Sequence, residues 1–208
     1  MIIILCGESN SGKDTLLKHI IKDWSADNKK PKISPIISYT TRPMRPNETN
    51  GVNYFFVTEK EFLSKLEPGS KTIGKIFEYR KYDTTMNDKP VSWYYGAAVV
   101  DIANKNYATV LDPDGINAFL KTYGRENCYV IKVSAGDETR KLRAQSRGDF
   151  NETEWKNRLE KDTEQFSPKN TANIINAAID NNDNNHSAFH RVDNLLCDLF
   201  ELHNKTSL

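Results

Sequence analysis

The residues best suited to chemistry lie in a glycine-rich stretch near the N-terminus, Gly7-Glu8-Ser9-Asn10-Ser11-Gly12-Lys13. The stretch matches the pattern G-x-x-x-x-G-K, whose glycines allow backbone angles that other residues resist. Its N–H groups can then converge on phosphate oxygens, helped by a following helix N-terminus, while Lys13 supplies a positive charge. The stretch therefore predicts a loop that holds the phosphates of one nucleotide.

The residue after Lys13 departs from the usual form of such a loop. Asp14 stands where a Ser or Thr normally helps to hold Mg²⁺, and Thr15 follows as another source of a hydroxyl. A carboxylate beside a triphosphate is repulsive unless it faces away or meets the metal. The sequence leaves these two alternatives for Asp14 open.

A second stretch, shortly after the first, carries donors for a second phosphate. Arg42 and Arg45 can each offer a planar fork of N–H groups to a monophosphate. Tyr54 and Tyr95 can add phenolic hydroxyls, and Glu48 is near enough to orient an arginine. Two anion-binding segments this close in sequence favour transfer of a phosphoryl group between two bound ligands. The plain alternative for the second stretch is a basic, solvated loop with aromatic packing.

Alternating strands and helices must position these residues. The apolar run Ile2–Cys6 predicts a strand buried on both faces of a parallel sheet, and helical spacing of apolar residues follows from near Lys13. Further strands are predicted at 108–111, 129–133 and 177–179, and further helices after Gly115 and at 139–146, 151–166 and 189–199. The alternation indicates an α/β fold of three layers.

Two segments interrupt this alternation within a chain long enough for one domain, 1–208. Residues 34–96 are rich in Tyr, Phe, Thr and Arg and predict a small β-containing insert. The polar segment at about 147–157 suits a lid. The remaining core then comprises 1–33 and 97–208.

Composition excludes several classes of function. Lys and Arg (29) nearly balance Asp and Glu (28), so the net charge of +1 gives no general attraction to nucleic acid or to a membrane surface. No apolar run suits a membrane span or a signal peptide. The three cysteines are widely spaced and odd in number, which predicts neither a disulfide framework nor a metal cluster, and favours a cytoplasmic location.

The pattern Ser38-x-Thr40-Thr41-Arg42-x-x-Arg45-x-x-Glu48-x-x-Gly51-x-x-Tyr54-x-Phe56 closely resembles the nucleoside-monophosphate segment of guanylate kinases. The resemblance extends over nearly the whole chain. It implies a P-loop kinase fold with a central parallel sheet, an inserted domain that binds the nucleoside monophosphate (NMP) and a lid. It also implies ATP-dependent phosphorylation of GMP, and of dGMP as a second substrate.

The resemblance implies roles for particular residues on the acceptor side. Glu78 resembles the carboxylate that accepts hydrogen bonds from guanine N1 and N2, two donors that adenine does not present. Trp93-Tyr94-Tyr95-Gly96 looks like the family's Asn-Tyr-Tyr-Gly segment. The implied GMP-binding residues are Ser38, Arg42, Arg45, Glu48, Tyr54, Glu78, Tyr95 and Asp114.

The same resemblance implies the ATP side and the catalytic groups. The ATP-binding residues are Ser9, Asn10, Ser11, Gly12, Lys13, Asp14, Thr15 and Asn181. Mg²⁺ is expected with ATP, near Thr15 and Asp112. The catalytic residues are Lys13, Arg42 and three arginines that close over the transferring group, Arg143, Arg147 and Arg158. Both substrates are small molecules, and the chain is expected to act as a monomer or weak homodimer.

Two departures from the family pattern concern base recognition. Ala97 stands where the family usually has a Ser or Thr whose hydroxyl helps to read guanine, although Ser38 remains. The stretch 82–92 is longer than its counterpart and should project from the NMP-binding insert. These departures leave open a broader nucleoside monophosphate kinase or a sugar-phosphate kinase. A scaffold that binds phosphorylated peptides is a further alternative, but such relatives lose the ATP loop, which is present here.

Overall fold

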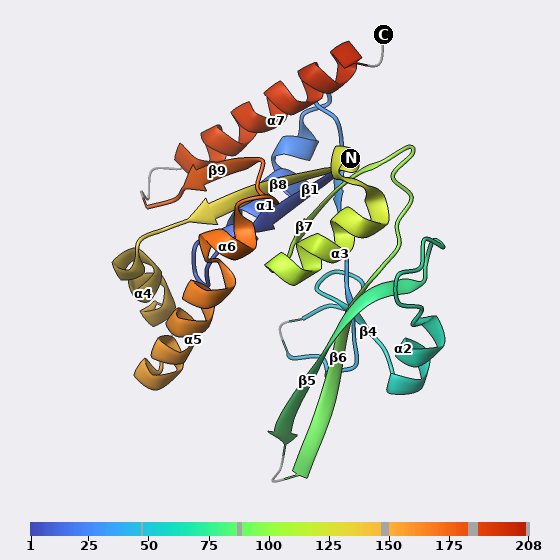
Figure 1. Cartoon of the computed structure of the whole chain (residues 1–208), viewed down its shortest axis with the longest axis vertical. Coiled ribbons are helices and arrows are strands. Elements are labelled where there is room, and N and C mark those ends of the chain that lie inside the picture. Colours follow the sequence, from blue (N-terminus) through green and yellow to red (C-terminus); the bar gives the residue numbers. More distant parts are fainter. Residues whose placement is uncertain (47, 87–88, 147–149, 183–186, 207–208) are drawn as a thin grey trace. The chain divides into compact units, whose positions relative to one another are not determined.

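The computed structural model describes residues 1–46, 48–86, 89–146, 150–182 and 187–206 (Figure 1). The chain forms two compact units. One comprises Met1–Ser34 and Lys105–Leu208, and the other comprises Pro35–Asn104. We call them unit 1 and unit 2.

Unit 1 is built on a five-stranded sheet in the order β2-β7-β1-β8-β9. The strands are β1 (Ile2–Cys6), β2 (Ile33–Pro35), β7 (Asn106–Val110), β8 (Cys128–Ser134) and β9 (Ala177–Asp180). β1 pairs in parallel with both β7 and β8, and β8 pairs in parallel with β9. Every residue of β1 is buried, as predicted for a strand covered on both faces.

Helices cover both faces of this sheet. The helices of unit 1 are α1 (Lys13–Lys22), α3 (Pro113–Tyr123), α4 (Asp137–Gln145), α5 (Glu152–Gln165), α6 (Pro168–Thr171) and α7 (Ser187–Thr206), with 3-10 turns η1 (Trp24–Ala26) and η2 (Arg125–Asn127). Figure 1 shows α7 on one side of the sheet and α3 on the other. The three-layer α/β architecture predicted from the alternation of elements is therefore confirmed.

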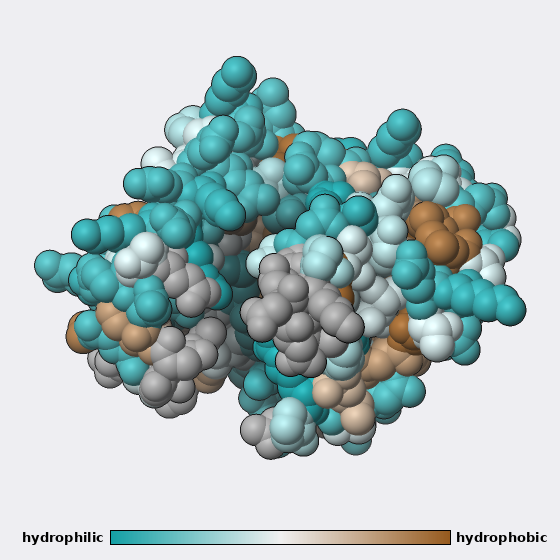
Figure 2. Space-filling model, turned by 90° about the horizontal axis from the view of Figure 1, so that it is seen from below, coloured by the Kyte–Doolittle hydropathy of each residue, from teal (hydrophilic) through white to brown (hydrophobic). Residues whose placement is uncertain are grey.

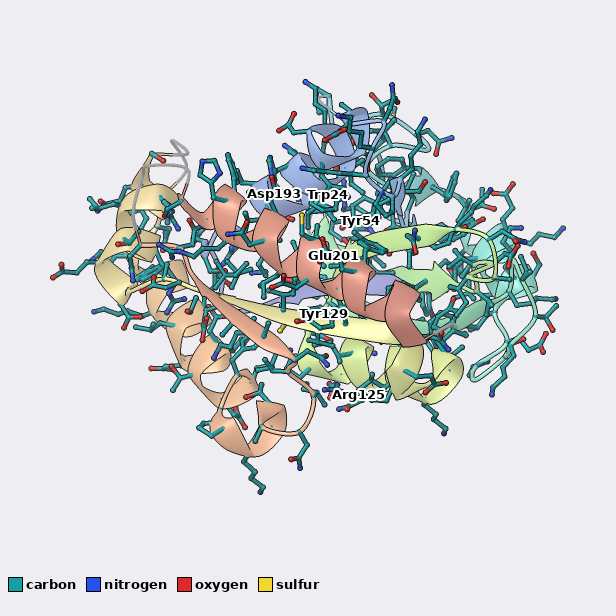
Figure 3. All side chains as sticks on the ribbon, turned by 90° about the horizontal axis from the view of Figure 1, so that it is seen from above. Trp24, Tyr54, Arg125, Tyr129, Asp193 and Glu201 are labelled. Atoms are coloured by element: carbon teal, nitrogen blue, oxygen red, sulfur yellow. The ribbon has the colours of Figure 1, made fainter. Side chains whose placement is uncertain are left out.

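The core between the sheet, α1 and α7 is apolar, and polar contacts fasten the two helices at its edge. Ile3 and Leu5 of β1 pack in one cluster with Leu16 and Val192. The Nε2 atom of His19 on α1 lies 2.9 Å from Oδ1 of Asp193, which is labelled on α7 in Figure 3. These contacts fix α1, and so the segment that precedes it, against the sheet.

The described residues of unit 2 form a four-stranded sheet in the order β4-β3-β6-β5 and one helix. Its elements are β3 (Tyr39–Thr40), β4 (Phe55–Phe56), α2 (Glu59–Lys65), β5 (Ile76–Met86) and β6 (Lys89–Ala98). A small cluster of buried residues, Phe62, Ile76 and Ala98, lies between α2 and the sheet. The stretch 82–92 forms the far part of the β5–β6 hairpin, apart from residues 87 and 88, which lie outside the described residues.

Several boundaries differ from the sequence-based predictions. Helix α3 begins at Pro113 and not after Gly115, because Asp112 caps it: its Oδ1 accepts a hydrogen bond from the Gly115 N–H at 2.7 Å. Strand β2 and helix α6 were not predicted, since each is short and buries one residue.

The three cysteines are free thiols. Cys6 and Cys128 are buried in β1 and β8, and this burial raises the pKa of each thiol to about 11. Cys197 is exposed on α7. The face in Figure 2 is largely hydrophilic, with apolar side chains in small separate patches. Within the described part of the chain, no helix has the length and apolar character needed to cross a membrane.

Candidate active site

The glycine-rich loop between β1 and α1 is closely packed. Gly7 has φ of 135° and Gly12 has φ of 99°, angles that side chains rarely permit. A Cβ atom on Gly7 would lie 2.0 Å from the carbonyl oxygen of Val133, and one on Gly12 would lie 2.2 Å from Nδ2 of Asn181. Gly7 is therefore required by conformation and by space, and Gly12 by conformation, since its close neighbour is the end of the Asn181 side chain.

Side chains from α4 and from the end of β9 hold the carbonyl groups of this loop. Arg143 donates from Nη1 to the carbonyl oxygens of Asn10 and Ser11, at 3.4 and 3.2 Å. Asn181 donates from Nδ2 to the same Ser11 oxygen at 2.8 Å. In a trans peptide the C=O group and the next N–H group point in opposite directions. The N–H of Gly12 is therefore turned away from Arg143 and Asn181, as an anion-binding loop requires.

Lys13 bends back over the loop. Its Nζ atom donates to the carbonyl oxygen of Glu8 at 2.7 Å. Burial lowers the pKa of Lys13, while the charges of Asp14, Asp162 and Glu8 act in the opposite direction. Desolvation is the largest influence, so the protein holds this amine in a setting that penalises its charge unless an anion is near.

Sequence reasoning missed two further residues at the loop, Asp162 on α5 and Arg140 on α4. Asp162 accepts hydrogen bonds from the N–H of Ser9 at 2.7 Å and from its hydroxyl at 3.1 Å. Arg140 donates to Asp162 at 3.0 Å. These residues are far from the loop in sequence and form no motif with it, so no local signal could have identified them.

The residues expected near Mg²⁺ lie on unit 1. β1 and β7 are parallel neighbours, with Leu5 opposite Val110, so the loop and Asp112 follow the same edge of the sheet. Thr15 is exposed in the first turn of α1. Hydroxyl and carboxylate oxygens are ligands that Mg²⁺ accepts alongside phosphates. The described residues contain no group of three or more His, Cys, Asp or Glu able to hold a metal, but phosphate-bound Mg²⁺ does not require such a cage.

The three arginines expected to close over the transferring group have different settings. Arg143 lies against the phosphate loop, as described above. Arg158 is exposed on α5. Arg147 and the rest of 147–149 lie outside the described residues, whereas residues 152–157 of the expected lid form the first part of α5.

In unit 2, Arg42 is buried with only 6% of its surface exposed. It donates from Nη2 to Oε1 of Glu48 at 2.7 Å and from Nη1 to Oε2 at 3.0 Å. Glu48 also accepts from the backbone N–H of Arg45 at 2.8 Å. The hydrogen bond from Arg42 first, and that from Arg45 second, lower the pKa of Glu48. Glu48 thus orients Arg42 and shapes the backbone at Arg45, whose side chain is exposed.

Aromatic rings complete this cluster. The Cζ atom of Arg42 lies 5.8 Å from the ring centre of Tyr54, which is labelled in Figure 3, and 5.6 Å from that of Phe56. Tyr54 and Tyr95 meet edge to face with their centres 5.8 Å apart. The structure therefore brings together Arg42, Glu48, Tyr54 and Tyr95, drawn from two separate segments of the chain.

The residues expected to read the base, Ser38 and Glu78, belong to segments on either side of β6 in the sheet of unit 2. Glu78 of β5 is the direct partner of Ala97 on β6. Ser38 immediately precedes β3, whose Tyr39 pairs with Gly96. Glu78 is largely buried and accepts a hydrogen bond from Arg80 at 3.1 Å. The register thus places Ser38 and Glu78 in one row across the sheet, with Ala97 between them.

Asp114 lies on unit 1, exposed near the start of α3. It lines a cavity of about 660 Å³ together with Asn117 of α3 and with Lys161 and Glu164 of α5. The structure thus groups Asp114 with polar residues of unit 1.

Comparison with known proteins gives a consistent result. A family model described as guanylate kinase matches residues 1–198. The chain is 28% identical over 173 residues to a guanylate kinase of Mycoplasmoides gallisepticum, covering 80% of this chain and 78% of that protein. It is 26% identical over 182 residues to a guanylate kinase of Schizosaccharomyces pombe, covering 87% and 83%. A shorter alignment, 41% identical over 68 residues, spans 33% of this chain and 30% of a Thermotoga maritima guanylate kinase.

A solved structure supports the fold. The crystal structure of guanylate kinase from Anaplasma phagocytophilum matches with a TM-score of 0.59 and 21% identity, covering 95% of this chain and 85% of that one. The family model extends from the first residue to residue 198, within α7. By its sequence and its fold, the chain belongs to the guanylate kinase family.

Proposed function

We propose that this chain transfers the γ-phosphoryl group of ATP to GMP, giving ADP and GDP, and accepts dGMP as a second substrate. Membership of the guanylate kinase family supports this reaction. The observation that carries the proposal is the packed glycine-rich loop. Its carbonyl groups are held from behind by Arg143 and Asn181, which leaves the Gly12 N–H on the side opposite these two donors. A scaffold would have no use for such a loop.

Phosphoryl transfer needs positioning and charge neutralisation more than covalent chemistry. In our proposal, Lys13 and the loop N–H groups hold the β- and γ-phosphates of ATP. Arg42 and Arg45, with the hydroxyls of Tyr54 and Tyr95, hold the acceptor phosphate. Arg147 and Arg158 neutralise the charge that spreads over the transferring group, and Arg143 contributes by holding the Asn10 and Ser11 carbonyls of the loop.

Mg²⁺ is the cofactor we propose, carried with ATP. Thr15 and Asp112 supply the oxygen ligands, directly or through water. When bound, the ion neutralises charge on the β- and γ-phosphates. The departure at Asp14 fits this site because its side chain is exposed at the start of α1 and is not packed into the loop.

Selection of guanine rests, in our proposal, on Glu78 and Ser38. The Glu78 carboxylate accepts from the two donors of guanine, N1–H and the N2 amino group. An adenine in the same place would meet the carboxylate with an unprotonated N1, and the unpaired acceptors would weaken its binding. Ala97 has no hydroxyl to contribute, so the carboxylate dominates the choice of base.

The reaction is tested by measuring ADP release from ATP with GMP, dGMP, AMP and UMP as acceptors. The proposal predicts release that depends on GMP or dGMP and is weak with the other two. Equal rates with all four would indicate a broader monophosphate kinase. An absence of release with every acceptor would contradict the proposal.

We also propose that the chain acts in the cytoplasm, as a monomer or weak homodimer and without nucleic acid. Support comes from its three free thiols, typical of a reducing compartment, and from its balanced charge. Sedimentation of the purified chain would measure its state of assembly.

A further inference from the structure

One residue of the phosphate loop, Ser9, is held by side chains at all three of its polar groups. Asp162 accepts from its N–H at 2.7 Å and from its hydroxyl at 3.1 Å. Arg140 donates to its carbonyl oxygen at 3.2 Å. The same Nη1 atom of Arg140 donates to Asp162 at 3.0 Å, which closes a ring of hydrogen bonds around Ser9. We call this arrangement the Ser9 clamp.

The clamp is buried. Arg140 has 3% of its surface exposed and Asp162 has 7%. The guanidinium group also lies over the ring of Trp155, with Cζ 5.6 Å from the ring centre. A buried ion pair resists being broken, because separation leaves an uncompensated charge away from water. Ser9 is therefore held more firmly than a loop residue that has solvent-exposed partners.

The two halves of the clamp come from the helices on either side of residues 147–149. Arg140 lies on α4, which ends before that segment, and Asp162 lies on α5, which begins after it. Each helix separately contacts Ser9, and the ion pair joins the helices to each other. The loop and the base of the expected lid are thus connected through one residue.

The charge of the clamp is compatible with a neighbouring triphosphate only as a pair. A lone carboxylate beside the loop would repel phosphate. Arg140 neutralises the charge of Asp162, so Asp162 can accept the hydrogen bond from the Ser9 N–H without leaving a net negative charge at the loop. Because the Ser9 carbonyl group points toward Arg140, the N–H of Asn10 in the same peptide points away from Arg140.

We propose that Arg140 and Asp162 are positioning residues for ATP: the Ser9 clamp fixes the loop peptides so that the following N–H groups converge on the phosphates. This inference rests on the proposed function, because it requires ATP at the loop. Both clamp residues belong to unit 1, whereas the arginines and the carboxylate proposed to bind GMP belong to unit 2. Loss of the clamp should therefore weaken ATP binding and leave GMP binding nearly unchanged. Displacing a positioned group by about 1 Å is enough to lower the reaction rate by a large factor.

The test is the double variant Arg140→Met/Asp162→Ala in the full chain. Replacing both partners removes the charges together, so the variant should fold, with thermal stability close to wild type. We expect KM for ATP to rise about tenfold or more, KM for GMP to stay within about twofold, and the affinity for Mg·ADP in calorimetry to fall in parallel with the change for ATP.

The matched control is Asp137→Asn. Asp137 is the other partner of Arg140, at 2.8 Å, but it is 67% exposed and does not contact Ser9. This change should leave both KM values near wild type. If the double variant fails to fold, Asp162→Asn is the alternative, because it keeps the shape of the side chain and one oxygen that accepts hydrogen bonds. This variant should raise KM for ATP about threefold and leave KM for GMP unchanged.

Two results would overturn the inference. One is a folded variant whose KM for ATP and affinity for Mg·ADP match wild type. The other is a parallel rise in both KM values with a lowered melting temperature, which would indicate a general structural role. A wild-type chain that fails to bind Mg·ADP would instead contradict the proposed function, and the two failures are therefore distinguishable.

Discussion

At the scale of single residues, Lys13 should be necessary for turnover but not for folding. Lys13→Met removes the proposed charge on the outer phosphates and should lower kcat by about a hundredfold or more. Lys18→Met, an exposed change on the same helix, is the control and should leave kcat near wild type. A Lys13→Met variant with normal turnover would exclude this lysine from the mechanism.

The lowered pKa of Lys13 gives the sign of its effect on stability. Burial penalises the charged form, so between the lowered native pKa and the usual value of about 10.4 the unfolded chain binds more protons. Wild-type stability should rise with pH across that window, and the full penalty is present below it. At neutral pH, Lys13→Met should therefore unfold at a urea midpoint no lower than that of wild type.

Glu78→Gln should change the choice of acceptor. The amide presents an N–H₂ group where guanine needs an acceptor, so kcat/KM for GMP should fall about a hundredfold relative to that for AMP. Glu59→Gln, at an exposed position on α2, is the control. Unchanged preference for GMP over AMP would mean that another group reads the base.

The sequence indicated some of these residue contacts and not others. Glu48 was expected to orient an arginine because it lies six positions from Arg42, and the structure brings the two within 2.7 Å. Asp162 and Arg140 are not predictable in this way. They contact a loop more than a hundred residues away. Helices α4 and α5 also carry many other charged residues, so nothing in the sequence distinguishes these two from residues that face solvent.

At the scale of elements, the junction of β1 with the loop depends on Gly7. Gly7→Ala would place a Cβ atom 2.0 Å from the backbone oxygen of Val133 at a φ of 135°. Backbone strain alone should lower the free energy of unfolding by about 1–3 kcal/mol, and the clash with β8 adds to it. Differential scanning calorimetry should show a melting temperature lower by at least about 4 °C. An unchanged melting temperature would show that β8 moves aside easily.

The elements predicted from the sequence are those with a strong apolar signal. β1 was predicted because a continuous apolar run suits a buried parallel strand, and β8 because its segment is mostly apolar; both are found. Strands β3 and β4 have two residues each, too few to show any period. Helix α7 runs beyond the predicted 189–199 because its polar ends carry no apolar pattern.

At the scale of the whole molecule, the two units should differ in local stability. Unit 1 buries a large cluster that joins the sheet to α1 and α7, whereas the cluster of Phe62, Ile76 and Ala98 is small. Opening unit 2 therefore exposes less apolar surface. Amide hydrogen exchange should be slowest in β1 and β8 and faster in β5 and β6. Equal protection in both sets of strands would contradict this.

The overall architecture was predictable because each layer has its own signal in the sequence. Strands alternate with amphipathic helices in unit 1, and that alternation has few solutions other than a parallel sheet covered on both faces. The path within unit 2 was not predictable. Its sheet depends on pairing between β3 and β6, segments more than fifty residues apart whose aromatic content favours strands without specifying partners.

The placement of the three thiols has a practical consequence. A maleimide dye reacts with thiolates, so it should attach to Cys197 and spare the two cysteines that are shielded within the sheet. Intact-mass spectrometry should show one adduct on the native chain and three after denaturation. The natural sequence thus provides a single attachment point for a fluorescent reporter on α7, and spectroscopy of ligand binding could begin without engineering the chain.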